Sequence, residues 1–516
     1  MKRWLWLLVL VCSTASAQDD PLELSVRALE ANDLEGAKRA LDQLAGADAE
    51  GAEARFQRGL LGFYGGQYAQ AVRDMEQAIA NAPRSPGLPE WRRLLSWASA
   101  ARDITSEFAQ ASSADGRYQI RYRKDLDSVL IPYALDAMER ADKAIASQLG
   151  IHLPSPIRLE FYPSARTLAE VSSLSLEHIR TTGTVALCKW NRLMVASPRS
   201  LLYGYPWLDT INHELVHLAL SYASKNHAPV WFHEGLAKLF ERTWRGLPPG
   251  AYLAPPTNNL LLKAARDKRL IAFERMHPSI AMLPSQEDAA LAFAQVVTFL
   301  ERFRERFGDQ GLTRTIELLA SGQDARLALA KVASESFNEL ETQWRATLTE
   351  RERPEQTASK ELKLRFVEGG EADESLDVAE GRARKHLRVG DLLWGRQRTL
   401  AAAREYEAAH RFAPTDPILA SRVARASLLG NAPERALSAL DSALKEHPSH
   451  APLQALRGAS LIALARNDEA REPLEEAIRL NPFDPAPHCQ LAQLAADGAE
   501  RGRERDACQA LGRPSQ

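Results

Sequence analysis

The chain of 516 residues has little net charge, few cysteines and almost no long apolar runs. Its formal net charge is −2, and losing the two positive charges of Lys2 and Arg3 with the leader described below makes it −4. A balance this close to neutral gives no electrostatic footprint for nucleic acid or an anionic membrane. Beyond the N-terminus no run of about 20 apolar residues occurs, so we expect no membrane span.

The one apolar run lies at the N-terminus and is short. Lys2 and Arg3 precede the segment Trp4–Val11, and a small-residue site that ends at Ala17 follows it. These are the three parts of a secretory signal peptide. We therefore expect cleavage after Ala17 and an exported protein, periplasmic or extracellular.

Loss of the leader leaves only three of the four cysteines, Cys188, Cys489 and Cys508. An oxidising compartment permits a disulfide between Cys489 and Cys508 across one C-terminal helical hairpin. We expect Cys188 to remain a free thiol that packs as a small hydrophobe.

The most informative motif is His213-Glu214-Leu215-Val216-His217. Residues four apart lie on one face of a helix, so His213 and His217 can bind one metal ion. Glu214 lies further round the helix, where it can take a proton from a metal-activated water. Glu234 follows on a second predicted helix that starts at Pro229, and it supplies a third ligand. This leaves a fourth position open, as in hydrolytic zinc sites, and His/His/Glu suits zinc best.

These residues resemble the gluzincin zinc peptidases, the group that includes thermolysin and aminopeptidase N. The closest likeness is to a peptidase-MA-like set in bacterial secreted proteins. It rests on HELVH and on P-x-W-F-H-E-G-L-A around Glu234, and it extends from about Tyr118 to Leu348. The resemblance implies one Zn²⁺ per chain on His213, His217 and Glu234, with Glu214 as catalytic base. It also implies an edge strand near 184–186 that pairs with the substrate backbone.

The chain departs from that family in two places. Phe293 stands where many relatives have a tyrosine and Val296 where they have a serine, and Lys238 stands where a carboxylate often supports a ligand histidine. Both changes concern groups around the metal rather than the ligands or the base. They leave open which side chain stabilises the oxyanion, and the candidates are Tyr203, Tyr205, Tyr222, His227 and His233.

An internal repeat of 34 residues occupies the C-terminal part. Pro414, Pro448 and Pro482 are evenly spaced, and small and large apolar residues precede each at fixed offsets. This period is typical of tetratricopeptide repeats, which are stacked helical hairpins. The same offsets recur around Ala37 and Ala71 near the N-terminus.

Between the repeats the pattern of polar and apolar residues is different. The segments 118–123, 157–162, 184–188 and 192–196 alternate like strands, and helical segments follow them. We therefore predict an α+β fold class, with a thermolysin-like zinc peptidase domain between all-α tetratricopeptide segments. The predicted divisions are a signal peptide (1–17), N-terminal hairpins (18–104), the peptidase domain (105–350), a charged linker (351–380) and C-terminal repeats (381–516).

The expected function is that of an exported zinc metallopeptidase that hydrolyses peptide bonds in peptides or unfolded protein. A zinc-activated water attacks the carbonyl and a glutamate acts as general base. The alternative is a tetratricopeptide scaffold or assembly factor with a catalytically weakened peptidase domain. Both readings predict a protein partner bound through the repeats.

Overall fold

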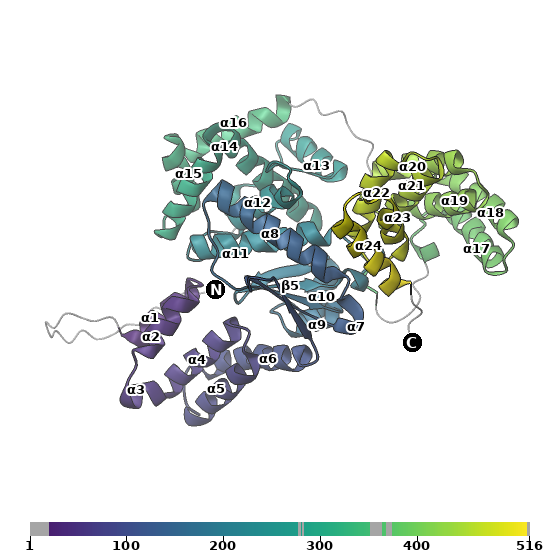
Figure 1. Ribbon diagram of the computed structural model, residues 1–516. Helices are drawn as coiled ribbons and strands as arrows, with labels where there is room; N and C mark the ends of the chain where they lie inside the picture. Colours follow the sequence, from purple (N-terminus) through teal and green to yellow (C-terminus); the bar gives the residue numbers. More distant parts are fainter. Residues whose placement is uncertain (1–19, 277–279, 281–282, 351–363, 368–373, 513–516) are drawn as a thin grey trace. The chain divides into compact units, whose positions relative to one another are not determined.

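The structure is a computed structural model that describes residues 20–276, 280, 283–350, 364–367 and 374–512 (Figure 1). The predicted signal peptide at 1–17 and most of the predicted linker at 351–380 lie outside the described residues. The chain divides into two compact units, Met1–Ser99 and Ala100–Gln516. In the described part, none of the helices has the length together with the apolar character that crossing a bilayer demands.

The predicted α+β fold class with a thermolysin-like domain is wrong. Helix accounts for 69% of the structure and strand for only 6%. The strand signals in the sequence mark real strands, but these are short and form one small sheet, while helices make up most of the rest. Within the described residues, this mostly helical architecture does not indicate a thermolysin-like domain.

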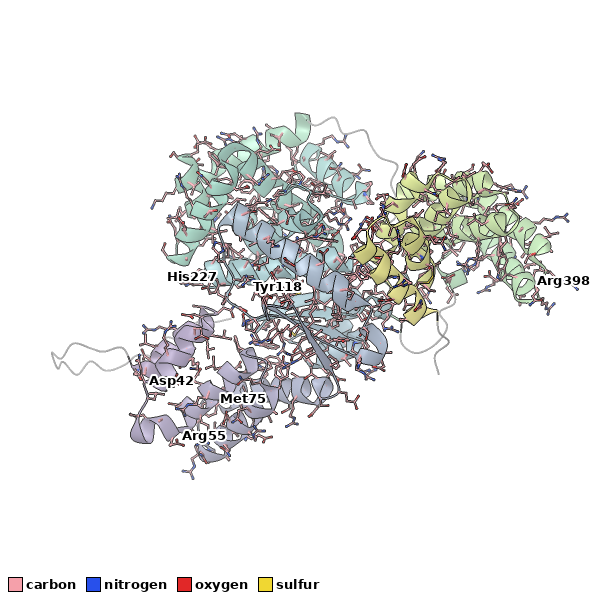
Figure 2. The ribbon with its side chains drawn as sticks, viewed as in Figure 1. Asp42, Arg55, Met75, Tyr118, His227 and Arg398 are labelled. Carbon is pink, nitrogen blue, oxygen red and sulfur yellow. A yellow bond between two sulfur atoms is a disulfide. The ribbon has the colours of Figure 1, made fainter. Side chains whose placement is uncertain are left out.

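The first unit consists of helical hairpins. Asp20 and Asp33 cap the first two helices by accepting backbone N–H groups through their carboxylates. Met75 is fully buried, and a Cβ added to Gly59 would lie 2.8 Å from its side chain, so glycine permits the close approach of two helices (Figure 2). The helices are α1 (Pro21–Glu30), α2 (Leu34–Asp42), α3 (Gly46–Glu50), α4 (Ala52–Tyr64) and α5 (Tyr68–Asn81), followed by α6 (Leu88–Thr105), which runs past the unit boundary.

The second unit contains the sheet, whose strand order is β1-β2-β3-β5-β4. The central pairs β2–β3 and β3–β5 are parallel, and the outer strands β1 and β4 are antiparallel to their neighbours. Helices α8 and α11 cover one face and α9 covers the other (Figure 1). The strands are β1 (Ala109–Ser112), β2 (Tyr118–Tyr122), β3 (Ile157–Tyr162), β4 (Ala186–Lys189) and β5 (Arg192–Ala196).

The helices around the sheet share one apolar core with it. Gly308, with φ 68°, interrupts the long helix α14, so that helix is two segments joined by a kink. The helices are α7 (Lys124–Asp127), α8 (Leu130–Leu149), α9 (Ala165–Glu170), α10 (Leu176–Thr182), α11 (Trp207–Ala223), α12 (Val230–Phe240), α13 (Pro255–Arg266), α14 (Gln286–Ala320), α15 (Ala325–Ala333) and α16 (Phe337–Glu350), with 3-10 turns η1 (Pro198–Ser200), η2 (Thr243–Arg245) and η3 (Phe273–Met276).

The C-terminal part is a TPR-like array of helical hairpins. Pro414, Pro448 and Pro482 each follow the end of a hairpin's second helix. A Cβ on Gly390 would lie 2.5 Å from Tyr406, and one on Gly458 would lie 2.4 Å from Leu474, which explains the glycines at this repeat position. After η5 (Glu374–Leu376), the helices are α17 (Gly381–Gly395), α18 (Thr399–Phe412), α19 (Pro417–Leu429), α20 (Pro433–Glu446), α21 (Ala451–Ala463), α22 (Asn467–Leu480), α23 (Pro485–Leu494) and α24 (Gly498–Leu511).

The disulfide that the sequence permits is present. Cys489 on α23 and Cys508 on α24 are bonded, and they link the two helices of the last hairpin. Cys188 on β4 is a free thiol, as expected.

Candidate metal centre

Helices α11 and α12 bring the motif residues together. Helix α11 begins directly after Pro206, and its apolar side chains are buried around most of its circumference because it lies inside the unit. Lys225 and Asn226 adopt left-handed φ values of 52° and 59° in the turn after α11. The chain therefore reverses, and α12 begins after Pro229 and packs against α11.

The three predicted ligands converge on one point. The Nε2 atoms of His213 and His217 are 3.1 Å apart. Oε2 of Glu234 lies 3.5 Å from Nε2 of His213 and 3.6 Å from Nε2 of His217. Donors on a tetrahedral zinc ion, at metal distances of about 2.0–2.2 Å, are about 3.3–3.6 Å apart. The three side chains therefore fit a single zinc ion with only a small separation of the two imidazoles.

The ligand side chains are not sealed in the core. His213, His217 and Glu234 retain 19%, 15% and 23% of their side-chain exposure. A structural zinc site closes its fourth position with protein, whereas a catalytic site keeps it open. The partial exposure of all three ligands favours the open kind of site.

The electrostatics around His213 also favour a cation. Burial lowers the pKa of His213, but the carboxylates of Glu234 and Glu241 outweigh it and raise that pKa to about 10. Burial opposes the charged form of Glu234 as well, yet His217 and His213 hold its pKa well below the ordinary value. Such paired imidazoles and carboxylates offer the donor set that zinc prefers.

Glu214 lies beside the ligands but in a different environment. Its side chain is buried, its carboxylate lies within 4.8 Å of both imidazoles, and it accepts a hydrogen bond from the backbone N–H of Cys188 on β4. Its Oε2 atom has no hydrogen-bond partner among the described residues. Burial raises the pKa of Glu214, partly offset by His217 and His213, and a raised pKa is what a general base near neutral pH needs.

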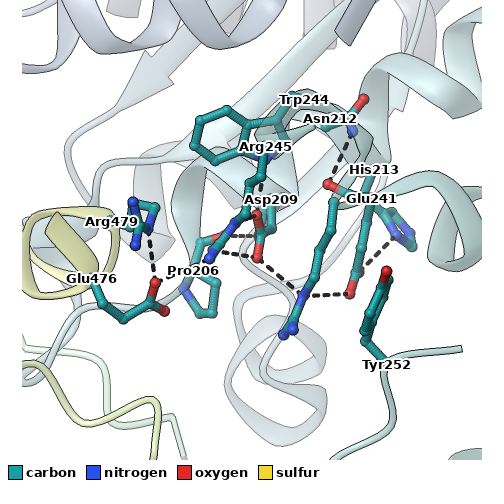
Figure 3. Close-up of polar contacts among 12 residues, drawn as sticks. Pro206, Asp209, Asn212, His213, Glu241, Trp244, Arg245, Tyr252, Glu476 and Arg479 are labelled. Carbon is teal, nitrogen blue, oxygen red and sulfur yellow. Dashed lines mark hydrogen bonds and ion pairs between the residues drawn. The ribbon is translucent and has the colours of Figure 1, made fainter. Parts of the chain in front are cut away.

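The carboxylate that supports His213 comes from Glu241 (Figure 3). Oε2 of Glu241 lies 3.8 Å from Nδ1 of His213, on the ring side opposite the ligand atom. Lys238, which replaces the expected carboxylate, pairs with Glu241 at 2.7 Å. A carboxylate on the second imidazole nitrogen orients the ring and raises its basicity toward metal. The supporting group has therefore moved from the fourth to the seventh residue after Glu234.

Asn212 fixes the end of α12 against α11. Its side chain is fully buried, and Nδ2 donates to the carbonyl oxygens of Phe240 at 2.8 Å and Glu241 at 2.9 Å. These carbonyls belong to the C-terminal end of α12, where a helix has no internal donors left. Asn212 therefore holds Glu241 within reach of His213, the next residue in the chain.

The candidates for an oxyanion donor separate clearly in space. The hydroxyl of Tyr205 donates to the carbonyl of Ala196 at 2.5 Å, and the ring of Tyr203 packs at a tilt against the ring of His450. His227 is exposed on the turn between α11 and α12 (Figure 2). The ring of His233, in contrast, lies 5.5 Å from that of His217, so His233 is the candidate beside the centre.

The three other positions singled out in the sequence lie on α11 and α14. Tyr222 is half-buried against the core, and Phe293 is 37% exposed on α14. Val296 is fully buried. Because both side chains are apolar, neither Val296 nor Phe293 offers a polar group. Sequence reasoning missed Glu241 and Asn212. The heptad spacing of Glu234 and Glu241, which places both on one helix face, was the available signal for Glu241.

Comparisons with known proteins do not assign the chain to a family. No protein-family profile and no curated protein matches it. Among solved structures, one similar chain comes from the "Crystal structure of APC/C hetero-tetramer Cut9-Hcn1", with 11% sequence identity and a TM-score of 0.25. The match covers 96% of this chain and 79% of that chain. A likeness at this score carries no argument about the site.

Proposed function

We propose that the centre is a zinc-dependent hydrolytic site that cleaves peptide bonds. The observation that carries the proposal is the triangle of donor atoms from His213, His217 and Glu234, with sides of 3.1, 3.5 and 3.6 Å. The resemblance of HELVH and its downstream glutamate to gluzincin peptidases supports the same chemistry.

Zinc bound by these three ligands supplies a Lewis acid that polarises a carbonyl and acidifies water. The chain's own residues do the rest. Glu214 accepts a proton from the attacking water at its carboxylate, and later donates it to the amine nitrogen as the C–N bond breaks. Glu241 keeps the imidazole of His213 oriented throughout.

Strand β4 supports a peptide as substrate. It is one of the two edge strands of the sheet, and its residue Cys188 donates a backbone hydrogen bond to Glu214. An extended peptide that adds to such an edge brings its backbone close to the base. This favours peptides or unfolded segments over folded proteins.

A second function is supported by the helical repeats. Helical-repeat arrays commonly bind protein segments in their concave surfaces, and the TPR-like hairpins of this chain support a scaffold or assembly factor. In that case the metal centre is weakened or structural. Export also stays a proposal, which the Cys489–Cys508 disulfide supports because such bonds persist in oxidising compartments.

The test compares the wild type with Glu214→Gln and Glu234→Ala on a mixture of unstructured peptides, with zinc content measured in parallel. Glu214→Gln should keep zinc and lose about 10²–10⁴-fold in turnover, because only the base is removed. Glu234→Ala should lose both zinc and turnover. Cleavage by Glu214→Gln near the wild-type rate would overturn the mechanism. A zinc-loaded wild type that cleaves no peptide would favour the scaffold.

A further inference from the structure

The segment that leads into α11 is hydrogen-bonded to the last turn of the repeat helix α22. The backbone N–H of Tyr205 donates to the carbonyl oxygen of Leu480 at 2.9 Å. The indole Nε1 of Trp207 donates to the carbonyl oxygen of Ile478 at 3.2 Å. The last carbonyls of a helix have no partners within that helix. The free carbonyl oxygens at the end of α22 therefore accept hydrogen bonds from the segment at the start of α11.

Gly204 makes this approach possible. Its φ is +69°, and a Cβ at this position would lie 2.0 Å from the carbonyl oxygen of Leu480. No side chain can be accommodated at that distance while the two segments keep their contact. The position requires glycine both for its backbone conformation and for the closeness of α22.

Arg245 adds a charged tie between the same helices (Figure 3). Its guanidinium binds both carboxylate oxygens of Asp209 on α11 at 2.7 Å, and Oε2 of Glu476 on α22 at 3.0 Å. All three side chains are less than a fifth exposed. A bidentate arginine–carboxylate pair of this kind fixes geometry as well as charge. Arg245 also lies shortly after α12, so one side chain connects α11, the end of α12 and the array.

Asp209 lies one helical turn before His213. Residues four apart share a helix face, so a displacement of Asp209 along or around the helix displaces the ligand as well. The distances from His213 to Glu234 and to Glu241 depend on the mutual position of α11 and α12. The ion pairs from Glu476 through Arg245 to Asp209 constrain the position of α11 and therefore affect both distances.

Two further contacts hold the array in place. The ring of Tyr203 lies 4.6 Å from that of His450, at a tilt, and packs against the apolar cluster formed mainly by α17–α19. The hydroxyl of Tyr133 on α8 donates to Glu504 at 2.8 Å, and Glu504 also binds His488 at 2.7 Å, all of them buried. Contacts of this extent and burial indicate that the array is packed firmly against the rest of the unit and is not a loosely tethered module.

We infer that the C-terminal array acts in cis as a clamp on the N-terminal end of α11, with Arg245 as the positioning residue through which it sets the ligand geometry of the metal centre. The zinc part of this inference rests on the proposed function. The clamp itself rests on contacts among the chain's own residues. Loss of these contacts would loosen the centre, and by linkage bound zinc would favour the docked array.

The first test uses Gly204→Ala in the full chain, with Gly150→Ala as its matched control. Gly150 has φ +67° and open space around it, so both variants carry the same backbone strain and only Gly204→Ala meets Leu480. Hydrogen exchange of the α11 amides 211–217 is measured without added metal. Gly204→Ala should raise their exchange rates about 10-fold over the control, because local opening controls exchange. Equal rates in the two variants would overturn the clamp.

The second test compares Glu476→Gln with Glu475→Gln and measures zinc affinity by competition with a chelator. Glu475 neighbours Glu476 on α22 but pairs only with Arg471 and Arg479 of the same helix in the described ion pairs. Glu476→Gln should weaken zinc binding roughly 5-fold, less than the loss of a direct supporting group, and Glu475→Gln should not. Equal affinities would overturn the role of Arg245. A wild type that binds no zinc would refute the proposed function, while the exchange experiment would still decide the clamp.

Discussion

Acidification should destabilise the second unit through His450, whose ring packs at a tilt against that of Tyr203 where the array meets the rest of the unit. The imidazole is 1% exposed, and neither ring nitrogen has a hydrogen-bond partner among the described residues. Burial, with a smaller effect of His447, lowers the pKa of His450 to about 3. Protonation therefore requires the side chain to leave its site or the structure around it to open.

The sign and size follow from linkage. An unfolded histidine has a pKa of about 6.5, so between that value and the folded pKa of about 3 the unfolded chain binds the extra proton. The free energy of unfolding therefore falls as the pH falls through this window. At pH 5, which is about 1.5 units below the unfolded pKa, the loss relative to pH 7 is about 2 kcal/mol.

The assay is urea unfolding at pH 7 and at pH 5 for the wild type, His450→Gln and His152→Gln. His152 is exposed, so its replacement serves as a matched control. Each variant is compared with itself at the two pH values. The cost of burying the glutamine amide at position 450 is the same at both values and therefore cancels. The wild type and His152→Gln should lose about 2 kcal/mol more than His450→Gln. The same loss in all three proteins would refute the reasoning.

Three other changes have defined outcomes. Glu241→Gln should weaken zinc affinity about 10-fold, because His213 loses its supporting carboxylate; chelator competition measures this, and an affinity equal to that of Glu475→Gln would contradict it. Gly458→Ala should lower the free energy of unfolding by about 1–3 kcal/mol, because its Cβ meets Leu474, whereas Gly498→Ala, with open space around it, should not. Reduction of Cys489–Cys508, 19 residues apart, should cost about 3 kcal/mol in thermal unfolding, and an unchanged midpoint would argue against it.

The parts of the site that depend on local spacing were predictable from the sequence. His213 and His217 are one helical turn apart, so their meeting follows from the helix alone. Glu234 reaches the histidines only if the chain turns and forms a second helix. The apolar pattern of the sequence predicted both helices. The repeats were equally clear, because Pro414, Pro448 and Pro482 mark the ends of units that the chain builds in the same way.

The parts that depend on distant packing were not predictable. Glu476 and Arg245 are 231 positions apart, and no periodicity connects them. The prediction of the fold class was wrong because it gave four correct strand signals too much weight. An alternating segment shows that a strand forms, but it does not show how much of the surrounding chain is helical.

The most direct test of the account is the zinc content of the purified full chain, measured without added metal beside Glu234→Ala and Glu214→Gln. The account predicts about one zinc per chain in the wild type and in Glu214→Gln, and much less in Glu234→Ala, because only the last variant removes a ligand. A folded wild type that neither contains zinc nor takes it up, or a Glu234→Ala variant that keeps it, would contradict the metal centre.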